Sequence, residues 1–498
     1  MNILMATSEA VPFAKTGGLA DVCGALPVEL AKLGHHPTLI LPAYRQVRSA
    51  GVPIEPTGVH FDVPIGSKTV SGSFLKSHLP DSKVPVYLVE HDHYYNRAGL
   101  YQDGGEDYRD NCERFVFFCR AVLEAIRLLD LKVDVLHTND WQTGLVPAIL
   151  KIEYRGVPGY ERIGSLLTIH NMAYQGAFWH WDMLLTGLDW KYFNWQQMEF
   201  FGNLNLLKTG LTFADRLNTV SPRYAEEIQT APLGCGLEGV LQNRRNVLSG
   251  IVNGVDYRQW NPAVDAHLPM HYTPETVATG KAACKAALQS ELGLPAAPGV
   301  PLVAFIGRLV EQKGIDLLAA TVRDWVQSHD AQWVVLGTGD ADYEEQFAML
   351  AQRFGHKVAT RLEFSDALAH RIEGGADVLV MPSRYEPCGL NQLYSLKYGT
   401  VPVVRATGGL VDTITDAGES SLAAGTATGF SFSDYSALAL AEALQHAALA
   451  YAKPTIWNEI VQTGMKQDWS WATSARGYVD LYRATINQVR DRVVAGKA

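Results

Sequence analysis

Apolar and polar residues alternate along the first half of the chain in a regular rhythm. Short apolar runs of strand length are separated by longer stretches in which apolar residues recur at helical spacing. The short runs predict strands at 2–7, 37–41, 84–89, 133–137, 165–169 and 217–220, and the longer stretches predict helices at 19–33 and 109–129. Strands and helices in alternation are typical of an α/β fold built on a parallel sheet.

The rhythm is interrupted by a tract with prolines at 262, 269 and 274, and then it starts again. Beyond this tract, the pattern predicts strands at 300–306, 333–336, 376–381 and 401–404, and helices at 343–354 and 473–494. A chain of 498 residues is too long for one ordinary core. We therefore predict two α/β domains of shared architecture, with the boundary near residue 252.

A glycine-rich segment, KTGGLAD at 15–21, lies between the first predicted strand and the first predicted helix. Glycines at 17 and 18 allow the backbone to approach an anion closely, and free N–H groups at the start of a helix favour phosphate. Lys15 adds a positive charge. A buried tight turn before a helix also requires glycine, so the segment by itself leaves both interpretations open.

A second set of polar loops follows the predicted strands of the later half. Arg308 and Lys313 fall in one loop, where they suit a leaving diphosphate, although a solvated surface loop has the same composition. TGGL at 407–410 is expected to present backbone N–H groups to phosphate at a helix start. Glu386 suits sugar hydroxyls or developing positive charge, and an ordinary turn carboxylate is the alternative.

Polar and aromatic residues also follow strands of the first half, at the strand ends where open α/β sheets bind ligands. Asp140 lies in HTNDWQTG at 137–144, and His170 begins HNMAYQGAF. His170 suits a sugar hydroxyl, with a buried structural histidine as the alternative. The segment 178–203 is rich in Trp, Phe and Tyr, which predicts either a satellite of the core or a platform for sugar rings.

Composition narrows the classes of protein and partner. The formal net charge is −10 and lysine and arginine form no blocks, which argues against a surface for nucleic acid or an anionic membrane. The apolar runs are too short for a membrane span and no signal or transit peptide is apparent, so we expect a cytoplasmic protein. The six cysteines form no CxxC pair and are expected to be reduced thiols.

We expect no metal and no cofactor at the site. Asp340 and Asp342 have a spacing that can hold a metal on a diphosphate, but they also fit the N-terminus of the helix predicted at 343–354. Arg308 and Lys313 offer a metal-free alternative. The chain contains no GxxxxGK[ST], which excludes a P-loop, and no GxGxxG after the first strand, which weakens a dinucleotide-binding interpretation.

Seven motifs occur in order along nearly the whole chain: KTGGLADV at 15–22, HTNDWQ at 137–142, HNMAYQG at 170–176, NGVDYRQWNP at 253–262, GRLVEQKG at 307–314, PSRYEPCGLNQLYSLKYG at 382–399 and TGGLVDT at 407–413. Together they resemble the bacterial glycogen synthases and plant starch synthases. The resemblance implies the GT-B fold, with two Rossmann-like domains facing across a cleft. It also implies transfer of glucose, with retention, from ADP-glucose to the non-reducing end of an α-1,4-glucan such as glycogen.

The resemblance further implies roles for residues at the matching positions. Catalytic roles fall to Lys15, His170, Arg308, Lys313 and Glu386. Substrate binding falls to Gly18, Asp21, Asp140, Asn253, Phe364, Cys388, Gly389, Leu390, Thr407, Gly408 and Gly409. The domain at 1–251 is implied to bind the acceptor and the domain at 252–477 the donor, and a helix at 478–498 is expected to cross back to the first domain.

Two positions depart from the patterns of related sequences. Phe364 stands where the family commonly has a tyrosine on adenine, which keeps stacking but loses a phenolic hydrogen bond. Tyr394 stands where many other sugar transferases carry a second glutamate, and in this it is similar to glycogen synthases. Two alternatives stay open: a transferase that uses UDP-glucose on another acceptor, and a carbohydrate-binding protein, which has no need to clamp a leaving group.

Overall fold

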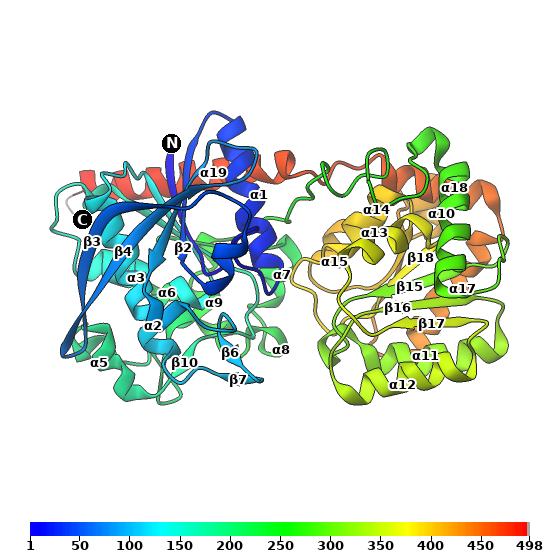
Figure 1. Ribbon diagram of the computed structural model, residues 1–498, viewed down its shortest axis with the longest axis horizontal. Helices are drawn as coiled ribbons and strands as arrows, with labels where there is room; N and C mark the ends of the chain where they lie inside the picture. Colours follow the sequence, from blue (N-terminus) through cyan, green and yellow to red (C-terminus); the bar gives the residue numbers. More distant parts are fainter. Residues whose placement is uncertain (496–498) are drawn as a thin grey trace. The chain divides into compact units, whose positions relative to one another are not determined.

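The computed structural model describes residues 1–495, which form two compact units. The first unit contains 1–220, 225–251 and the described residues from 471 onward, and the second contains 221–224 and 252–470. The second unit therefore ends earlier than the domain boundary predicted at 477, because the last helix already belongs to the first unit. Each unit is built on a sheet of its own (Figure 1).

The main sheet of the first unit has the strand order β14-β13-β9-β8-β1-β2-β5-β4-β3. Neighbours from β14 to β5 pair in parallel, whereas β4 pairs antiparallel with both β5 and β3. The strands are β1 Asn2–Ala6, β2 His36–Pro42, β3 Glu55–Ile65, β4 Lys68–His78, β5 Pro85–Glu90, β8 Val135–Asn139, β9 Gly164–Ile169, β13 Arg216–Thr219 and β14 Leu248–Gly250. Two small antiparallel sheets accompany it, formed by β6 Gln102–Asp103 with β7 Glu106–Asp107, and by β10 Ala177–Phe178, β11 Glu199–Phe200 and β12 Asn203–Asn205.

Helices connect these strands and cover the sheet. They include α1 Gly18–Lys32, α3 Asn111–Leu128, α4 Val146–Ile152, α6 Leu206–Phe213, α9 Glu238–Asn243 and α19 Trp471–Val494. The last of them, α19, packs beside α1 and β9 (Figure 1). Its Tyr482 hydroxyl lies 2.9 Å from Nδ1 of the buried His137, and its Arg492 pairs with the buried carboxylate of Asp215 at 2.7 Å. These contacts fix the C-terminal helix to the first sheet.

The second unit has a sheet of parallel strands in the order β17-β16-β15-β18-β19-β20. The strands are β15 Leu302–Ile306, β16 Gln332–Leu336, β17 Val358–Arg361, β18 Val378–Met381, β19 Val401–Arg405 and β20 Phe430–Phe432. The helices are α10 Val277–Leu292, α11 Ile315–Ser328, α12 Ala341–Arg353, α13 Asp366–Gly375, α14 Asn391–Tyr398, α15 Gly409–Thr413, α16 Glu419–Ala423, α17 Ala437–Tyr451 and α18 Pro454–Met465.

Both faces of this second sheet are buried, which explains why its central strands β15 and β18 are continuous apolar runs. Successive residues of a strand point to opposite faces. Val303 and Phe305 of β15 accordingly pack into one hydrophobic cluster with α11 and α17, and Leu302 and Ala304 pack into another with α13 and α14. Because helices cover both faces of such a parallel sheet, its strands have no solvent-facing positions, and polar residues therefore do not alternate with apolar ones.

Leaving aside the β3–β4 hairpin, the chain order of the parallel strands reverses direction once in each sheet. In the first unit, the chain proceeds from β1 through β2 to β5 on one side, and from β8 through β9 to β13 on the other. In the second, β15 leads to β16 and β17, and β18 leads to β19 and β20 on the opposite side. The carboxyl ends at such a switch point leave room for a ligand between diverging loops.

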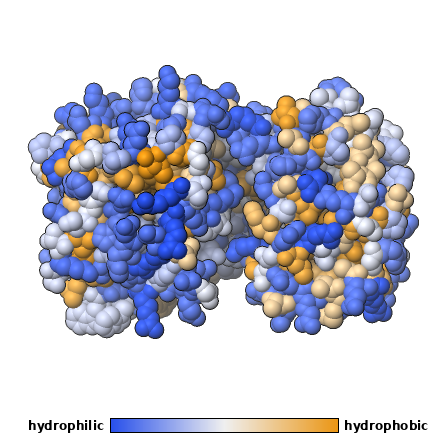
Figure 2. All heavy atoms as spheres, viewed as in Figure 1, coloured by the Kyte–Doolittle hydropathy of each residue, from blue (hydrophilic) through white to orange (hydrophobic). Residues whose placement is uncertain are grey.

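The strands and helices predicted from the apolar pattern are confirmed, with ends displaced by a few residues at most. The β3–β4 hairpin was not predicted, because much of β3 and β4 is exposed and their apolar residues form no continuous run. No helix within residues 1–495 is both long and apolar enough to cross a membrane. On the face shown in Figure 2, hydrophilic residues predominate and apolar residues form patches among them.

Candidate active site

Two residues predicted from strand ends come together in the first unit. Asp140 follows β8 and His170 follows β9, and these two strands pair in parallel. Oδ1 of Asp140 accepts a hydrogen bond from the backbone N–H of His170 at 2.7 Å. Asp140 has a positive φ of 56° with ψ of −171°, which lies outside the left-handed helical region and is rare for residues other than glycine. The bond fixes both residues at the switch-point edge of the sheet.

The surroundings shift the protonation of both groups. Burial raises the pKa of Asp140 to about 7, although the N–H of His170 acts in the opposite direction. Burial lowers the pKa of His170 to about 3, so its imidazole is neutral near pH 7. Nε2 of His170 lies 3.0 Å from Oδ1 of Asn139, whose amide nitrogen donates to the carbonyl of Ala6. Nε2 therefore carries the proton, and Nδ1 is left as an acceptor.

The glycine-rich segment places Lys15 beside Asp21, with Nζ and Oδ1 2.8 Å apart and side chains 46% and 33% exposed. Helix α1 begins at Gly18, so the N–H groups of its first turn have no acceptor within the helix. A Cβ added at Gly17 would meet no heavy atom within 4 Å. Packing does not require glycine there, which favours the interpretation that the segment leaves room for a ligand.

A carboxylate that the sequence analysis missed, Glu9, holds this segment in place. Glu9 is 4% exposed, and its Oε2 accepts from the backbone N–H groups of Thr16 at 2.5 Å and Gly17 at 3.2 Å. Its Oε1 accepts from the Thr16 hydroxyl at 2.6 Å. The expectation that the N–H groups of this loop are free for phosphate is thus wrong for Thr16 and Gly17. In the first turn of α1 the N–H of Ala20 donates to the carbonyl of Gly17 at 3.3 Å, so the expectation applies there only to the other N–H groups.

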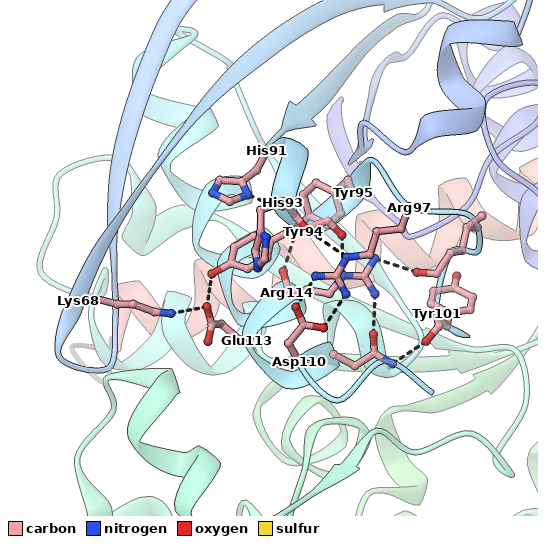
Figure 3. A network of polar contacts seen from close by, with 12 residues as sticks. Lys68, His91, His93, Tyr94, Tyr95, Arg97, Tyr101, Asp110, Glu113 and Arg114 are labelled. Carbon is pink, nitrogen blue, oxygen red and sulfur yellow. Dashed lines mark hydrogen bonds and ion pairs between the residues drawn. The ribbon is translucent and has the colours of Figure 1, made fainter. Parts of the chain in front are cut away.

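Glu9 is itself held by Tyr101, whose hydroxyl donates to Oε1 at 2.7 Å. Tyr101 belongs to a loop organised by Arg114, a fully buried arginine of α3 (Figure 3). The guanidinium of Arg114 donates to two backbone carbonyl groups and to Oδ1 of Asn111 at distances of 2.6–2.9 Å. Asn111 in turn donates to the carbonyl of Tyr101 at 2.9 Å. Because a buried charge is costly unless it is hydrogen-bonded, this network fixes the loop that presents Tyr101.

In the second unit, the two loops at the switch point meet through an ion pair. Lys313 follows β15 and Glu386 follows the adjacent strand β18, and Nζ of Lys313 lies 2.6 Å from Oε2 of Glu386. The Glu386 side chain is 7% exposed, and the Ser383 hydroxyl also donates to Oε2 at 3.1 Å. Gly314 has φ of 71°, and a Cβ there would lie 2.0 Å from the carbonyl oxygen of Pro382. Only glycine allows this close approach of the two loops.

Arg308 lies in the same loop as Lys313, but its guanidinium is on the surface. Its side chain is exposed, and Nη2 donates to Oε1 of Gln312 at 3.2 Å. The guanidinium therefore has donors left for a ligand. Arg308 and Lys313 place two positive charges at the carboxyl end of β15, where Glu386 offsets one of them. The solvated-loop alternative describes Arg308 but not Lys313.

The segment after Glu386 packs against the start of α15. The N–H of Gly409 donates to the carbonyl of Glu386 at 3.1 Å, so the expectation that it is free for phosphate is wrong. Gly408 has φ of 47°, and a Cβ there would lie 2.0 Å from the same carbonyl oxygen. These glycines serve the close approach of two loops. Gly389 has φ of 75°, and Leu390 precedes α14, which begins at Asn391.

Other predicted substrate-binding residues of the second unit differ in exposure. Asn253 is 5% exposed, and its Oδ1 is buried without a hydrogen-bond partner among the described atoms. A backbone hydrogen bond from Asn253 reaches the thiol of Cys388, whose pKa burial raises to about 12. Thr407 is 3% exposed, whereas the Phe364 side chain is 86% exposed after β17. The ring of Phe364 is therefore accessible to an aromatic ligand.

The acidic pair considered as a metal site lies at a helix N-terminus. Asp340 is the N-cap of α12 and Asp342 lies in its first turn, as the alternative interpretation predicted. Both carboxylates are exposed. Negative charge in the first turn stabilises a helix, which accounts for these residues without a ligand.

The aromatic segment of the first unit lies at the surface rather than in a core. Trp179, Trp181 and Trp190 are 62%, 49% and 41% exposed. The Trp181 and Trp190 rings are 5.5 Å apart with an interplanar angle of 36°, and Phe193 adjoins Trp190 at 5.1 Å. Exposed rings in a row are more consistent with the sugar-platform interpretation than with a core satellite.

Family models account for both units. Residues 2–243 match the starch synthase catalytic domain, and residues 293–460 match the glycosyl transferases group 1 family. The match limits leave the segment that joins the two regions, together with α19, outside both models.

Full-length relatives carry one name. A glycogen synthase of Rhodopirellula baltica is 47% identical, with 99% of each chain covered. A glycogen synthase of Anaeromyxobacter dehalogenans strain 2CP-C is 47% identical over 97% of this chain and 99% of the relative. The similarity therefore includes both units and α19.

Solved structures identify the fold. The catalytic domain of starch synthase IV from Arabidopsis thaliana bound to ADP and acarbose is 30% identical, with a TM-score of 0.89 over 98% of this chain and 99% of that one. Sucrose-phosphate synthase from Thermosynechococcus elongatus, 19% identical, shares the fold with a TM-score of 0.57 over 97% and 98%. The two Rossmann-like α/β units are thus those of a GT-B glycosyltransferase. With the glycosyltransferase regions in order and 47% identity over 99% of its length, the chain belongs to the glycogen synthase family.

Proposed function

We propose that the enzyme transfers glucose from ADP-glucose, with retention, to the non-reducing end of an α-1,4-glucan and releases ADP. The observation that carries the proposal is the cationic loop of Arg308 and Lys313 at a sheet switch point, paired with the buried carboxylate of Glu386. Such a loop suits a leaving diphosphate. Starch synthase IV, similar over nearly the full chain, was solved with ADP and the oligosaccharide acarbose.

The proposed roles follow from charge and hydrogen-bonding capacity. As the glucosyl–phosphate bond breaks, negative charge grows on the diphosphate, which Arg308 and Lys313 stabilise. Glu386 holds Lys313 in position, and we assign its carboxylate to the glucose site. Asn253, with a buried unpartnered oxygen, accepts a sugar hydroxyl. The exposed ring of Phe364 stacks on adenine.

The first unit is proposed to supply the acceptor side and part of the phosphate site. Neutral His170 binds a glucose hydroxyl, with Nδ1 available as acceptor. Asp21 and Asp140 bind the acceptor. Lys15 and the first-turn N–H groups at Gly18 contact the donor phosphate. Within the second unit, Gly408 and Gly409 allow the close approach of two loops, and the N–H of Gly409 is already used by the carbonyl of Glu386.

Donor identity is the sharpest test of the proposal. We expect incorporation of labelled glucose into glycogen from ADP-glucose, and release of one ADP for each glucose transferred. With UDP-glucose at the same concentration, incorporation should be at least tenfold slower. A preference for UDP-glucose would refute the donor assignment, and glycogen binding without transfer from either donor would favour the carbohydrate-binding alternative.

Transfer is expected to proceed without a divalent cation. The charges of Arg308 and Lys313 replace those of a metal at the diphosphate, and the acids Asp340 and Asp342 are engaged at a helix start. Dialysis against EDTA should leave the rate of glucose incorporation largely unchanged. Loss of activity that magnesium or manganese restores would contradict this and return the acidic pair to consideration.

Trp181→Ala is expected to weaken glycogen binding about fivefold, because the loss of one stacking ring costs about 1 kcal/mol. Trp181 is half-exposed and adjoins Trp190, so the row of rings loses its central member. Electrophoretic retardation in native gels that contain glycogen measures the affinity. Leu438→Ala, which removes an exposed apolar side chain of α17, is the control. Equal retardation of the wild type and both variants would exclude the platform.

We also place the reaction in the cytoplasm. All six cysteines lie within the described chain as free thiols, and Cys23, Cys112, Cys119, Cys284 and Cys388 are buried. Unpaired buried thiols are the usual state in a reducing compartment. This supports the localisation expected from the sequence.

A further inference from the structure

We propose that the second unit holds a transition-metal site, of the kind that takes Zn²⁺, formed by His267, Asp366 and His370. One ligand atom from each of these side chains lies within 4.8 Å of the other two. Within residues 1–495 this is the one group of three or more such side chains with that spacing. The site is distinct from the residues assigned to the donor and the acceptor, and the inference does not rest on the proposed function.

Two of the ligands are supplied by one turn of helix. Asp366 and His370 lie four residues apart at the start of α13, so their side chains project from the same face. Oδ2 of Asp366 and Nε2 of His370 are 3.8 Å apart. Neighbouring ligand atoms of a tetrahedral Zn²⁺, with bonds of about 2.0–2.1 Å, are about 3.3 Å apart. A small rotation of the exposed Asp366 side chain closes this difference.

The third ligand comes from a loop far away in sequence. His267 belongs to the segment that follows NGVDYRQWNP, and its ring centroid lies 4.8 Å from that of His370. His267 and Asp366 are exposed, whereas His370 is buried. The site is thus anchored on one rigid imidazole and completed by two side chains that are free to adjust.

The buried imidazole is oriented as metal-binding histidines usually are. Nδ1 of His370 lies 2.7 Å from Oδ2 of Asp265, which therefore accepts the Nδ1 proton. The Tyr398 hydroxyl donates to the same oxygen at 2.5 Å, which fixes the carboxylate. With Nδ1 protonated, Nε2 keeps its lone pair for a metal ion, and it lies 3.8 Å from Oδ2 of Asp366. A carboxylate behind a histidine sets the tautomer and raises the basicity of the ligand nitrogen.

Two further contacts hold this arrangement rigid. The other oxygen of Asp265, Oδ1, accepts from the backbone N–H of His267 at 2.9 Å, so one carboxylate positions both histidines. The Trp260 ring stacks on the His370 ring, with centroids 3.7 Å apart and an interplanar angle of 11°. The His370 ring and the backbone of His267 are thus fixed before the ion binds, and binding has to order only the exposed side chains of His267 and Asp366.

The donor set selects the class of cation. Two imidazole nitrogens and one carboxylate oxygen suit Zn²⁺ and its first-row neighbours, whereas Mg²⁺ and Ca²⁺ prefer oxygen ligands alone. Three protein ligands leave a fourth position for water. Because the ligands come from α13 and from the 261–273 loop, a bound ion would join these two segments of the second unit.

The test uses the full chain without a polyhistidine tag, stripped of metal with a chelator and then titrated. Calorimetry with Zn²⁺ is expected to give one saturable equivalent per chain. Co²⁺ is expected to give visible absorption bands of a low-coordinate nitrogen-containing site, and excess Mg²⁺ should not displace either ion. Zn²⁺ should also raise the melting temperature, because a ligand that binds only the folded state stabilises it.

Variants decide whether these residues hold the ion. His267→Ala and Asp366→Ala should each weaken Zn²⁺ binding at least tenfold. The metal-free melting temperature should be unchanged in His267→Ala, whose side chain is exposed, and only slightly lower in Asp366→Ala, which removes a first-turn charge of α13. His356→Ala removes another exposed histidine of the second unit and should bind as the wild type does. If Zn²⁺ does not bind the wild type saturably, the proposal is wrong, and His370 and Asp265 form only a structural hydrogen-bonded pair. Unchanged affinity in both site variants would overturn it as well.

Discussion

Lys313→Ala is expected to lower the turnover of glucosyl transfer about 100-fold, which corresponds to about 3 kcal/mol of lost stabilisation at the diphosphate. Arg308→Ala should have an effect of similar size. If the charge of each residue acts as the bond to the diphosphate breaks, binding of a neutral glucan is not affected. Initial rates at saturating ADP-glucose and varied glycogen measure the turnover and the apparent affinity for glucan separately.

The structure adds a second consequence for Lys313 that Arg308 does not share. Nζ of Lys313 lies 2.6 Å from Oε2 of Glu386, whose side chain is 7% exposed. Removal of the lysine leaves this carboxylate with only the Ser383 hydroxyl as its described side-chain partner. An unpaired buried charge is destabilising. Lys313→Ala should therefore lower the melting temperature as well as the rate, whereas Arg308→Ala should lower the rate alone.

Three further variants make the comparison decisive. Lys313→Gln with Glu386→Gln removes both charges, and should recover the lost stability but not the rate. Lys313→Arg keeps the charge and should retain more activity than Lys313→Ala, although its wider fork does not fit the same pocket. Lys453→Ala, at an exposed position of the second unit, should leave both properties unchanged. Near-normal turnover of both Lys313→Ala and Arg308→Ala would show that this loop does not contribute to catalysis.

The parts of the fold that could be predicted are those in which local pattern and burial agree. Strands β15 and β18 are buried on both faces and are continuous apolar runs, so each can be recognised from a few consecutive residues of the sequence. The β3–β4 hairpin could not be predicted in this way, because its register depends on cross-strand pairs between exposed residues. The end of the second unit was misplaced because α19 is one uninterrupted helix whose sequence does not indicate which sheet it covers.

The site was predictable where a side chain follows a strand, and not where its role depends on a distant partner. Asp140 and His170 meet because parallel strands end together. Glu9 also follows a strand, but its bonds to Thr16 and its neighbour depend on how the loop folds back. The Gly409 N–H was expected to be free, and it is used by a carbonyl of another loop. Sequence spacing does not reveal such competition for backbone donors.

The stability of the wild type is expected to fall by about 2 kcal/mol relative to that of Asp140→Asn as pH rises from 5 to 8. Burial raises the pKa of Asp140 to about 7, whereas an aspartate in the unfolded chain titrates near 3.9. Between these values the folded state holds a proton that the unfolded state has released. Stability therefore decreases with rising pH across this interval, and it levels off above pH 7.

The magnitude follows from the same linkage. Each pH unit over which one proton separates the two states contributes about 1.4 kcal/mol, so the interval from pH 5 to the folded pKa contributes about 2.7 kcal/mol. The site is not fully shielded from water, because Asp140 is of intermediate exposure, and this reduces the effect to about 2 kcal/mol. Asparagine has the same shape and does not titrate, and both proteins share the same backbone at a φ of 56°, so the pH dependence of the difference between them isolates this carboxyl group.

Urea unfolding of both proteins at pH 5, 6, 7 and 8 measures the difference, provided that the m-values agree. Asp130→Asn is the matched control, because Asp130 also has a positive φ, of 50°, but lies exposed. Its stability relative to the wild type should stay constant over this pH range. If the wild type and Asp140→Asn instead keep a constant difference, the carboxyl group is ionised throughout, and the acceptor side of the site would carry a full negative charge at neutral pH.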